Sequence, residues 1–366
     1  MPVTKLSISA FLELASLHPC LDVRSPGEYA HAQIPGALSL SLFSDEERKV
    51  VGTAYKQQGK QTAIKIGLDF FGVKMRGMVE AASKIIEGHK GLQDAAVAAQ
   101  DVGTEAPISK NIVLVHCWRG GMRSAAVAWL LDLYGFEVYT LVGGYKTYRN
   151  WVLRHFEDSY AINILGGYTG SGKTGMLRQL KTEGQQVIDL ERLANHKGST
   201  FGGIGQGPQP TQEMFENLLA TQLSKTAAST FWIEDESQRI GKLNIPHSFW
   251  ITMRTKQVFF MEIPFEERLQ NIVKEYGACD SEQLKVAIQR IQKRLGPLET
   301  KTTLLHLQEN NLQECFRILL AYYDKSYGKS LQNRENIERL LNKIPALTVD
   351  SMSNVEKVIL CSTANT

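Results

Sequence analysis

The chain has 366 residues, 43% of them hydrophobic and 22% charged, with 41 Lys and Arg against 38 Asp and Glu. This length favours two domains that each bury a core, and the composition excludes a disordered, fibrous or collagen-like chain. The formal net charge of +3 gives no sign of a nucleic-acid partner.

The cysteines and the apolar runs indicate the compartment. The cysteines are far apart and form no CxxC pair, which is typical of reduced thiols in a cytoplasmic protein and not of a disulfide framework or a zinc site. We see no signal peptide and no run of about 18 apolar residues, so we expect a soluble cytoplasmic protein without a membrane partner. The five cysteines are Cys20, Cys117, Cys279, Cys315 and Cys361.

The first 150 residues alternate short apolar runs with helical patterns. The runs 19–24, 111–116 and 137–141 predict strands, and 124–134 predicts a helix between the last two. Strand, helix and strand in this order form a βαβ unit, which implies a parallel sheet. Residues 88–110 are rich in Ala and Gly with little periodicity, and they predict a surface insertion before the central strand.

A second strand-led unit begins near Ala161, so we divide the chain into domains 1–155 and 156–366. Its predicted strands are 161–165, 186–189, 230–235 and 257–262, with a helix at 211–223. The sequence after Pro264 becomes mostly helical. The predicted helices there are 265–276, 281–295, 312–323 and 335–343.

A loop around Cys117 has the pattern of an anion site. Residues 116–124, HCWRGGMRS, follow a buried-looking strand and precede a helix, so backbone N–H groups and the helix N-terminus would face an anion. Cys117 would act there as a nucleophile, with Arg123 closing around the anion. The alternative is a buried structural cysteine at a strand end.

A phosphate loop follows at residues 167–174. The sequence GYTGSGKT fits G-x-x-x-x-G-K-[ST] at every position, with an apolar run before it and a helical pattern after it. Its glycines let the backbone surround a phosphate, its lysine neutralises charge, and its threonine can ligate Mg²⁺ or a phosphate oxygen. The candidate residues are Gly167, Gly170, Ser171, Gly172, Lys173 and Thr174.

An acidic strand end and a glycine-rich segment lie downstream. Residues 231–237, FWIEDES, resemble a Walker B element, in which Asp235 and Glu236 would hold Mg²⁺ together with Thr174. A solvated strand edge is the alternative. Residues 195–203 lie where P-loop kinases place a substrate segment, or they form a surface loop.

The first domain resembles the rhodanese family. Residues 21–29, LDVRSPGEY, and 31–37, HAQIPGA, look like the opening signature of that family, whose loop cysteine carries sulfur or a related atom. That role corresponds to Cys117. Five residues separate Cys117 from Arg123, against four in common single-domain rhodaneses. His-Cys-x5-Arg is also the protein tyrosine phosphatase signature, so a rhodanese-fold phosphatase remains an alternative.

The combination resembles the bacterial tRNA 2-selenouridine synthases. The resemblance implies an α/β chain in which a rhodanese-like parallel-sheet domain precedes a P-loop NTPase-like domain with a helical C-terminal part. The motifs that carry it are 117–124, 166–174, 198–217, 234–237, 294–296 and 322–324.

The family's activity, as the resemblance implies it, replaces the sulfur of 2-thiouridine at the tRNA wobble position with selenium from selenophosphate. Geranyl diphosphate would first alkylate that sulfur, giving S-geranyl-2-thiouridine, so the chain would be a transferase for selenium and for geranyl groups. Cys117 would carry selenium as S-selanylcysteine, with Arg119 and Arg123 binding the phosphate. The P-loop would bind geranyl diphosphate, with Mg²⁺ and without ATP dependence. The partners would be tRNA with a 2-thiouridine-type wobble base and the selenophosphate-producing enzyme.

Net charge does not locate a tRNA site, but the helical C-terminal part mixes basic and aromatic residues that could contact phosphates and stack a base. The alternative is an amphipathic face against the core. Two rivals for the whole chain are a Cys-x5-Arg phosphatase fused to a P-loop kinase-like module, and a nucleotide-switched adaptor. The candidate tRNA-binding residues are Arg290, Lys293, Arg294, Arg317, Tyr322, Tyr323, Lys325, Tyr327 and Lys329.

Overall fold

The computed structural model describes residues 3–98, 111–226 and 228–364. The chain divides into two compact units, Met1–Arg154 and His155–Thr366, so the division falls one residue from the predicted boundary. Each unit is built on its own five-stranded sheet, in which all strands are parallel.

The sheet of the first unit has the order β1-β5-β4-β2-β3, with β4 at its centre. Its strands are β1 (Thr4–Leu6), β2 (Cys20–Asp22), β3 (Leu38–Ser39), β4 (Ile112–His116) and β5 (Glu137–Leu141). The predicted strands at 19–24, 111–116 and 137–141 are therefore present and parallel. Strand β4 lies between β2 and β5, so the loop that follows β4 begins at the middle of the sheet edge.

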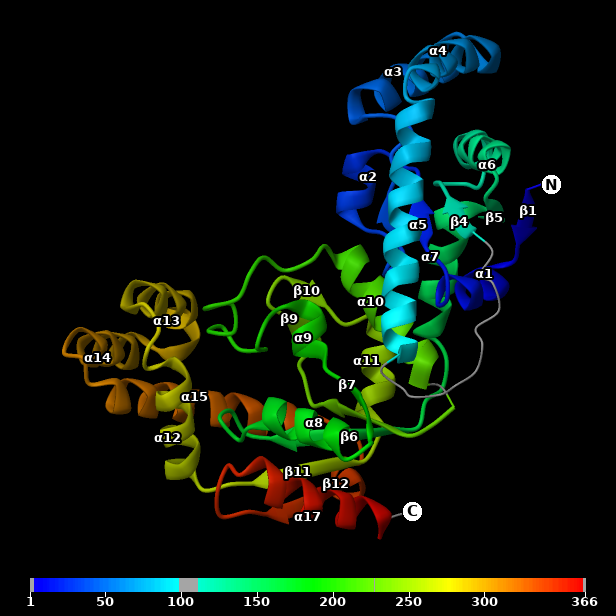
Figure 1. The fold of residues 1–366 in the computed structure, drawn as a ribbon. Coiled ribbons are helices and arrows are strands. Elements are labelled where there is room, and N and C mark those ends of the chain that lie inside the picture. Colours follow the sequence, from blue (N-terminus) through cyan, green and yellow to red (C-terminus); the bar gives the residue numbers. More distant parts are fainter. Residues whose placement is uncertain (1–2, 99–110, 227, 365–366) are drawn as a thin grey trace. The chain divides into compact units, whose positions relative to one another are not determined.

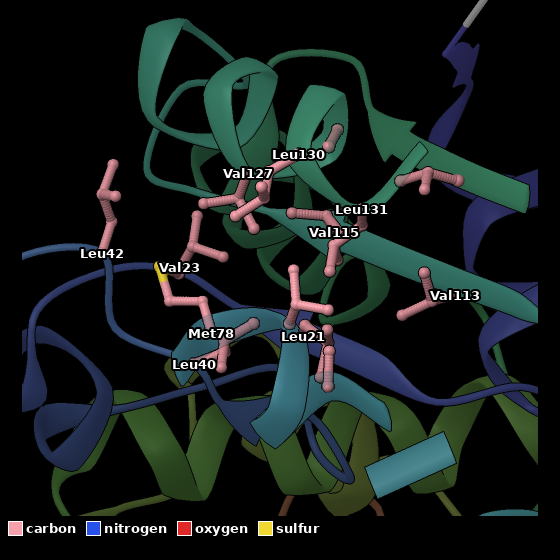
Figure 2. Packing of buried hydrophobic residues seen from close by; sticks show 14 of the residues in the cluster. Leu21, Val23, Leu40, Leu42, Met78, Val113, Val115, Val127, Leu130 and Leu131 are labelled. Carbon is pink, nitrogen blue, oxygen red and sulfur yellow. The ribbon is translucent and has the colours of Figure 1, made fainter. Parts of the chain in front are cut away.

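Helices cover both faces of this sheet, which explains why β4 is apolar along its length. Val113 and Val115 pack in one cluster with Val127 and Leu131 of α6 (Met122–Tyr134), as Figure 2 shows. On the other face, His116 makes ring contacts with Phe11 and Tyr145. The helices on that side are α1 (Ile8–Ala15) and α7 (Gly144–His155).

Four further helices precede β4 in the described part of the chain, and the last of them corrects a prediction. These are α2 (Pro26–His31), α3 (Asp45–Gln57), α4 (Lys60–Gly72) and α5 (Met75–Ala98). The predicted surface insertion at 88–110 is wrong in its first part, since residues 88–98 continue helix α5. Ala-rich sequence has high helix propensity, and α5 packs on the core through Met78 and Ala82. The remainder of the predicted insertion lies outside the described residues.

The sheet of the second unit has the order β12-β11-β6-β8-β7, and the strand before the P-loop is at its centre (Figure 1). A short antiparallel hairpin, β9 (Arg239–Ile240) with β10 (Leu243–Asn244), stands apart from this sheet. The sheet strands are β6 (Ile162–Gly167), β7 (Gln186–Ile188), β8 (Phe231–Glu234), β11 (Val258–Glu262) and β12 (Leu341–Pro345).

Helices α8 (Lys173–Thr182) and α17 (Ser351–Thr363) share one apolar core with this sheet, through Leu165, Leu180 and Val355. The connections between strands carry α9 (Leu190–Ala194), α10 (Gln212–Thr226) and α11 (His247–Arg254). The P-loop thus joins a central strand to a helix that packs back onto the sheet, and both of its ends are fixed by core contacts.

Four helices form a lobe at one end of this unit, with an apolar core of their own (Figure 1). They are α12 (Phe265–Tyr276), α13 (Ser281–Leu295), α14 (Pro297–Gln308) and α15 (Leu312–Gln332). The predicted helix at 335–343 is wrong. The structure has a single turn, α16 (Ile337–Leu340), followed by strand β12, because residues 341–345 pair in parallel with β11 at the sheet edge. This tertiary pairing outweighs the local helical pattern.

Candidate functional site

Cys117 lies directly after β4, at the start of the loop that leads into α6. The residue is 3% exposed, and its thiol donates to Ser124 Oγ at 3.2 Å. The Ser124 hydroxyl in turn donates to the carbonyl of Gly121, the residue before α6, at 3.1 Å. The sulfur is therefore held at the N-terminal end of a helix, where the helix dipole favours negative charge.

The backbone of this loop is fixed by the start of α7. Tyr145 N donates to the carbonyl of Cys117 at 2.8 Å, and Lys146 N donates to that of Trp118 at 2.9 Å. Gly120 has φ +61°, and a Cβ atom there would lie 2.5 Å from the carbonyl oxygen of Leu141. Only glycine fits this position without strain, so the loop geometry depends on both its φ angle and its close approach to the next strand end.

The two arginines of the loop lie in different surroundings. Arg123 Nη1 donates to Glu28 Oε2 at 2.7 Å, whereas Arg119 is exposed. Burial alone would raise the pKa of Glu28, but the hydrogen bond and charge of Arg123, with help from Arg48, hold it at about 2. An anion that binds Arg123 must therefore share it with Glu28. Sequence reasoning missed Glu28, although it lies inside the quoted signature 21–29.

A cluster of buried polar side chains lies next to the cysteine loop. The Arg24 side chain is 1% exposed, donates to both carboxylate oxygens of Asp22, and lies 3.8 Å from the ring centroid of Tyr145. His116 is fully buried, and burial lowers its pKa to about 4, opposed by the charge of Asp22. The ring is therefore neutral at physiological pH, and this cluster positions the loop without reaching the thiol.

The P-loop connects β6 to α8 through two glycines with positive φ, Gly170 at +83° and Gly172 at +77°. The Lys173 ammonium donates to the carbonyl of Gly167 at 2.8 Å, so the lysine side chain folds back to the start of the loop. Ser171 Oγ is buried and has no hydrogen-bond partner among the described residues. A buried hydroxyl left without a partner at this place suits a ligand oxygen.

Helix α12 holds the P-loop carbonyls. Arg268 Nη1 donates to Thr169 O at 3.1 Å, and Asn271 Nδ2 donates to Gly170 O at 3.0 Å. The Arg268 guanidinium also makes a bidentate ion pair with the Asp324 carboxylate of α15, with N···O distances of 2.8 and 2.7 Å. The P-loop is thereby tied to two helices of the C-terminal lobe.

The carboxylates after β8 divide into two groups. Asp235 accepts hydrogen bonds from Arg334 Nη2 at 2.5 Å and from the Tyr327 hydroxyl at 2.6 Å. Tyr327 lies near the C-terminal end of α15, and Arg334 follows that helix. The Thr174 hydroxyl instead donates to Glu191 Oε2, at 2.9 Å. The structure therefore brings Glu191, which sequence reasoning missed, to the metal position predicted for Asp235.

Glu191 belongs to a cluster of carboxylates in which Glu234 is buried and Glu191 and Glu236 are half-buried. Glu191 N donates to Glu234 Oε1 at 2.8 Å, and oxygens of Glu191 and Glu236 both border Gly198. Burial raises the pKa of all three carboxyls, and their mutual repulsion adds to this for Glu234 and Glu236, while Lys173 opposes it for Glu191 and Glu236. No group of three such side chains in the described part of the chain is arranged to hold a metal by itself. A Mg²⁺ ion here would need phosphate and water ligands as well, which is its usual coordination in phosphate sites.

A cavity of about 1190 Å³ opens from the P-loop in the second unit. Its lining includes Thr174, Glu191 and Glu236 at the phosphate end, the segment 196–201, and helices of the C-terminal lobe. The basic residues on its walls are Lys173, Arg178, Lys197, Arg239, Lys242, Arg254, Arg290 and Arg294.

The structure separates the candidate tRNA-binding residues. Arg290 and Arg294 of α13 are exposed and line the cavity, while Lys293, Lys325 and Lys329 are exposed outside its lining. The remaining candidates make internal contacts, as the alternative of an amphipathic face predicts. Arg317 pairs with Glu266 and Glu314, Tyr322 and Tyr323 pack on the lobe core, and Tyr327 bonds to Asp235.

Together, these features define a two-unit α/β protein in which a cysteine loop of anion-binding pattern precedes a P-loop unit with a basic cavity. The model of the tRNA 2-selenouridine synthase AAA domain matches residues 160–344. The chain belongs to the tRNA 2-selenouridine synthase family, a family of tRNA-modifying enzymes.

Relatives match over most of their length. The tRNA 2-selenouridine synthase of Sulfurovum sp. (strain NBC37-1) is 34% identical over 358 residues, which cover 88% of this chain and 91% of that protein. The synthase of Shewanella piezotolerans (strain WP3) is 33% identical over 379 residues, which cover 94% and 96%. A solved structure from Thermus thermophilus aligns at a TM-score of 0.31 with 12% identity over 57% of this chain, a likeness too weak to add to the assignment. No helix among the described residues is long and apolar enough to cross a bilayer.

Proposed function

We propose that this protein replaces the sulfur of 2-thiouridine at the tRNA wobble position with selenium from selenophosphate, through an S-geranyl-2-thiouridine intermediate. Membership of the family supports the tRNA modification, and the presence of two separate anion loops supports a reaction in two stages. In the first stage the thiocarbonyl sulfur attacks C1 of geranyl diphosphate, the C–O bond breaks, diphosphate leaves and the N3 proton is lost. In the second, the outer selenium of the Cys117 adduct attacks C2 of the base, the C2–S bond breaks and geranylthiol leaves. A thiol reductant then cleaves the remaining S–Se bond, which releases 2-selenouridine and leaves Cys117 in a mixed disulfide that a second thiol reduces.

The first unit acts as the rhodanese-like selenium site. Cys117 carries selenium as S-selanylcysteine, and Arg119, Arg123 and the α6 N-terminus bind the phosphate of selenophosphate. The observation that supports this role is the position of the thiol, held by Ser124 at the end of β4 beside a helix N-terminus. The ion pair of Arg123 with Glu28 keeps its guanidinium at the loop before the donor binds.

The second unit binds geranyl diphosphate by the P-loop. Lys173 and the backbone from Gly170 to Thr174 contact the diphosphate, and the buried hydroxyl of Ser171 supplies a donor. The residues also fit Mg²⁺: Thr174, Glu191 and Glu236 would hold it together with phosphate oxygens. Such an ion would neutralise charge on the diphosphate as it leaves. Asp235 has a structural role in this proposal, since it pairs with Arg334.

The tRNA contacts the basic wall of the cavity. Arg290 and Arg294 lie on one face of α13, and Arg239 and Lys242 lie on the β9–β10 hairpin. Replacing a residue that contacts one phosphate reduces the salt dependence of binding by about one in log–log slope. Arg294→Ala should do so, whereas Lys325→Ala, exposed outside the cavity lining, should not. Equal slopes for the two variants would contradict this surface.

Mass analysis of tRNA nucleosides tests the whole proposal. The protein is incubated with 2-thiouridine tRNA, selenophosphate and geranyl diphosphate, each co-substrate omitted in turn. Cys117→Ser should abolish 2-selenouridine and leave S-geranyl-2-thiouridine, while Lys173→Ala should abolish geranylation. Cys20→Ser, a buried cysteine outside the loop, is the matched control. Loss of both products in folded Cys117→Ser would contradict the division of labour.

The phosphorus product tests the role of Cys117 more directly. Transfer of the selenium atom to the thiolate leaves phosphite, whereas attack by selenium on the tRNA base followed by hydrolysis of the P–Se bond leaves phosphate. A selenium adduct on Cys117 together with phosphite supports S-selanylcysteine; phosphate alone contradicts it. Neither tRNA product, with hydrolysis of an aryl phosphate instead, would favour the Cys-x5-Arg phosphatase.

A further inference from the structure

Trp118, the residue that follows the nucleophile of the first unit, has an exposed side chain. It is 36% exposed, whereas Cys117 is 3% exposed. The carbonyl of Trp118 accepts a hydrogen bond from Lys146 N at 2.9 Å, and that of Cys117 accepts one from Tyr145 N at 2.8 Å. The backbone therefore holds an exposed indole one residue away from a buried thiol.

A stack of buried groups supports this indole. The ring centroids of Trp118 and Tyr145 are 5.7 Å apart, with an angle of 40° between the ring planes. Tyr145 is fully buried, and the Arg24 guanidinium, paired with Asp22, lies 3.8 Å from its ring centroid. The indole is thus fixed by Tyr145 while part of it stays open to solvent, which is how a platform for a nucleobase is built.

A single exposed aromatic residue is normal on a protein surface, so its surroundings decide its role. Helix α7 starts at the cysteine loop, because a Cβ atom on Gly144 would clash with the carbonyl oxygen of Cys117. Residues 144–155 contain no Asp or Glu. The basic residues of α7 before its last position are Lys146, Arg149 and Arg154, of which Lys146 and Arg154 are exposed.

The indole therefore lies at the start of a basic helix. Aromatic side chains that stack bases, next to cations that contact phosphates, are the combination that binds single-stranded nucleic acid. The nucleophile beside this combination identifies which nucleotide would occupy it, since only the base that reacts has to reach Cys117.

We propose that Trp118 is the stacking platform for the wobble base at the selenium site, and that Lys146 of α7 contacts the phosphate backbone beside that base. The inference rests on the proposed function and deepens it, because it names the residues of the first unit that receive the RNA. The wobble base has to leave its neighbours in the anticodon stack to present C2 to the adduct on Cys117, and unstacking costs free energy. Stacking on Trp118 offsets this cost.

Photo-crosslinking tests the contact without any reaction at Cys117. The probe is a tRNA anticodon stem-loop with 5-iodouridine at the wobble position, which on irradiation forms a bond to an aromatic side chain stacked on it. Peptide mass analysis of the full-length wild type should locate a crosslink at Trp118. Trp129→Ala, which removes a 52% exposed tryptophan of α6, is the matched control and should keep that crosslink. Absence of a crosslink at Trp118 in the wild type would overturn the inference.

Kinetics separates a platform for RNA from a residue that only shapes the loop. The substrates are selenophosphate and a stem-loop that already contains S-geranyl-2-thiouridine, so the P-loop reaction is not needed. Trp118→Ala should lower kcat/KM for the RNA about tenfold, the loss expected for one base stack, without the same loss in kcat/KM for selenophosphate. Trp118→Phe should recover most of the loss, and thermal unfolding checks that each variant is folded. Equal losses for both substrates, or no loss for the RNA, would overturn the platform.

The salt dependence of the same reaction tests Lys146. Lys146→Ala should reduce the log–log slope of kcat/KM for the RNA against salt by about one, because one phosphate contact is lost. Lys84→Ala, which removes an exposed lysine of α5, is the control and should keep the slope of the wild type. Equal slopes for the two variants would refute the phosphate contact.

The proposed function fails differently. If the wild type crosslinks at Trp118 but converts no geranylated RNA to 2-selenouridine, the platform stands and the proposed reaction is wrong. If it converts that RNA without a crosslink at Trp118, the reaction stands and the platform is wrong.

Discussion

The ion pair between Arg268 and Asp324 allows the sharpest test of how the P-loop is supported. Arg268 is 3% exposed and uses its guanidinium four times: twice for Asp324, once for the carbonyl of Ile263 and once for that of Thr169. Arg268→Leu would leave the Asp324 carboxylate without its partner in a largely buried position. Removing one partner of a buried pair costs about 3–5 kcal/mol. Because Asp324 keeps 21% exposure, water relieves part of that cost, and we expect about 3 kcal/mol.

A double-mutant cycle shows whether the cost comes from the unpaired charge. In Arg268→Leu/Asp324→Leu the charge is gone, so the double variant should be more stable than the sum of the single effects predicts, by about 1–3 kcal/mol. Urea unfolding is followed by far-UV circular dichroism and by tryptophan fluorescence, since the two units can unfold separately. The control is Arg317→Leu, a half-buried arginine on α15 whose ion-pair partners Glu266 and Glu314 are exposed, and this change should have little effect. A cost below about 1 kcal/mol for Arg268→Leu, or additive effects in the double variant, would refute the reasoning.

Three further predictions follow from single contacts. Because the Glu28 pKa is held at about 2, its contribution is present above its ordinary pKa of about 4.3 and is lost as pH falls towards 2. Glu28→Gln should therefore lower the free energy of unfolding at pH 7 but much less at pH 2, and equal effects at both would contradict the ion pair with Arg123. Gly120 and Gly36 both have positive φ, but only Gly120 lies against a backbone carbonyl. Gly36→Ala should cost about 1 kcal/mol, and Gly120→Ala should destabilise the first unit by more than that. Equal unfolding temperatures for the two variants would refute this. Tyr327→Phe should cost about 1–2 kcal/mol in urea unfolding, because it removes a donor to a buried carboxylate, and no change would mean that the bond contributes nothing.

The two loops could be predicted from sequence because their signals are local. A strand, a glycine-bearing loop and a helix follow each other within about twenty residues around Cys117, and again around Lys173. Positive φ at Gly120, Gly170 and Gly172 is a backbone requirement that the residue type itself reveals.

The partners of the acidic residues could not be predicted in this way. Asp235 bonds to Tyr327 and Arg334, which lie more than ninety positions along the chain, so no spacing rule connects them. Strand β12 was mistaken for a helix for a related reason: its conformation follows from pairing with β11 at the sheet edge. Glu191 carries no motif of its own, and only the fold brings it to Thr174.

The position of the charges explains why the net charge of the chain does not indicate its partner. A net charge of +3 averages over the whole chain, whereas a polyanion responds to charges within a Debye length of about 8 Å. Basic side chains outnumber carboxylates on the walls of the P-loop cavity. Glu191, Glu234 and Glu236 gather beside Thr174, where burial raises the pKa of each carboxyl. A small surplus of positive charge over the whole chain is thus compatible with a local excess of basic side chains around the P-loop cavity, and that local excess is what a polyanion responds to.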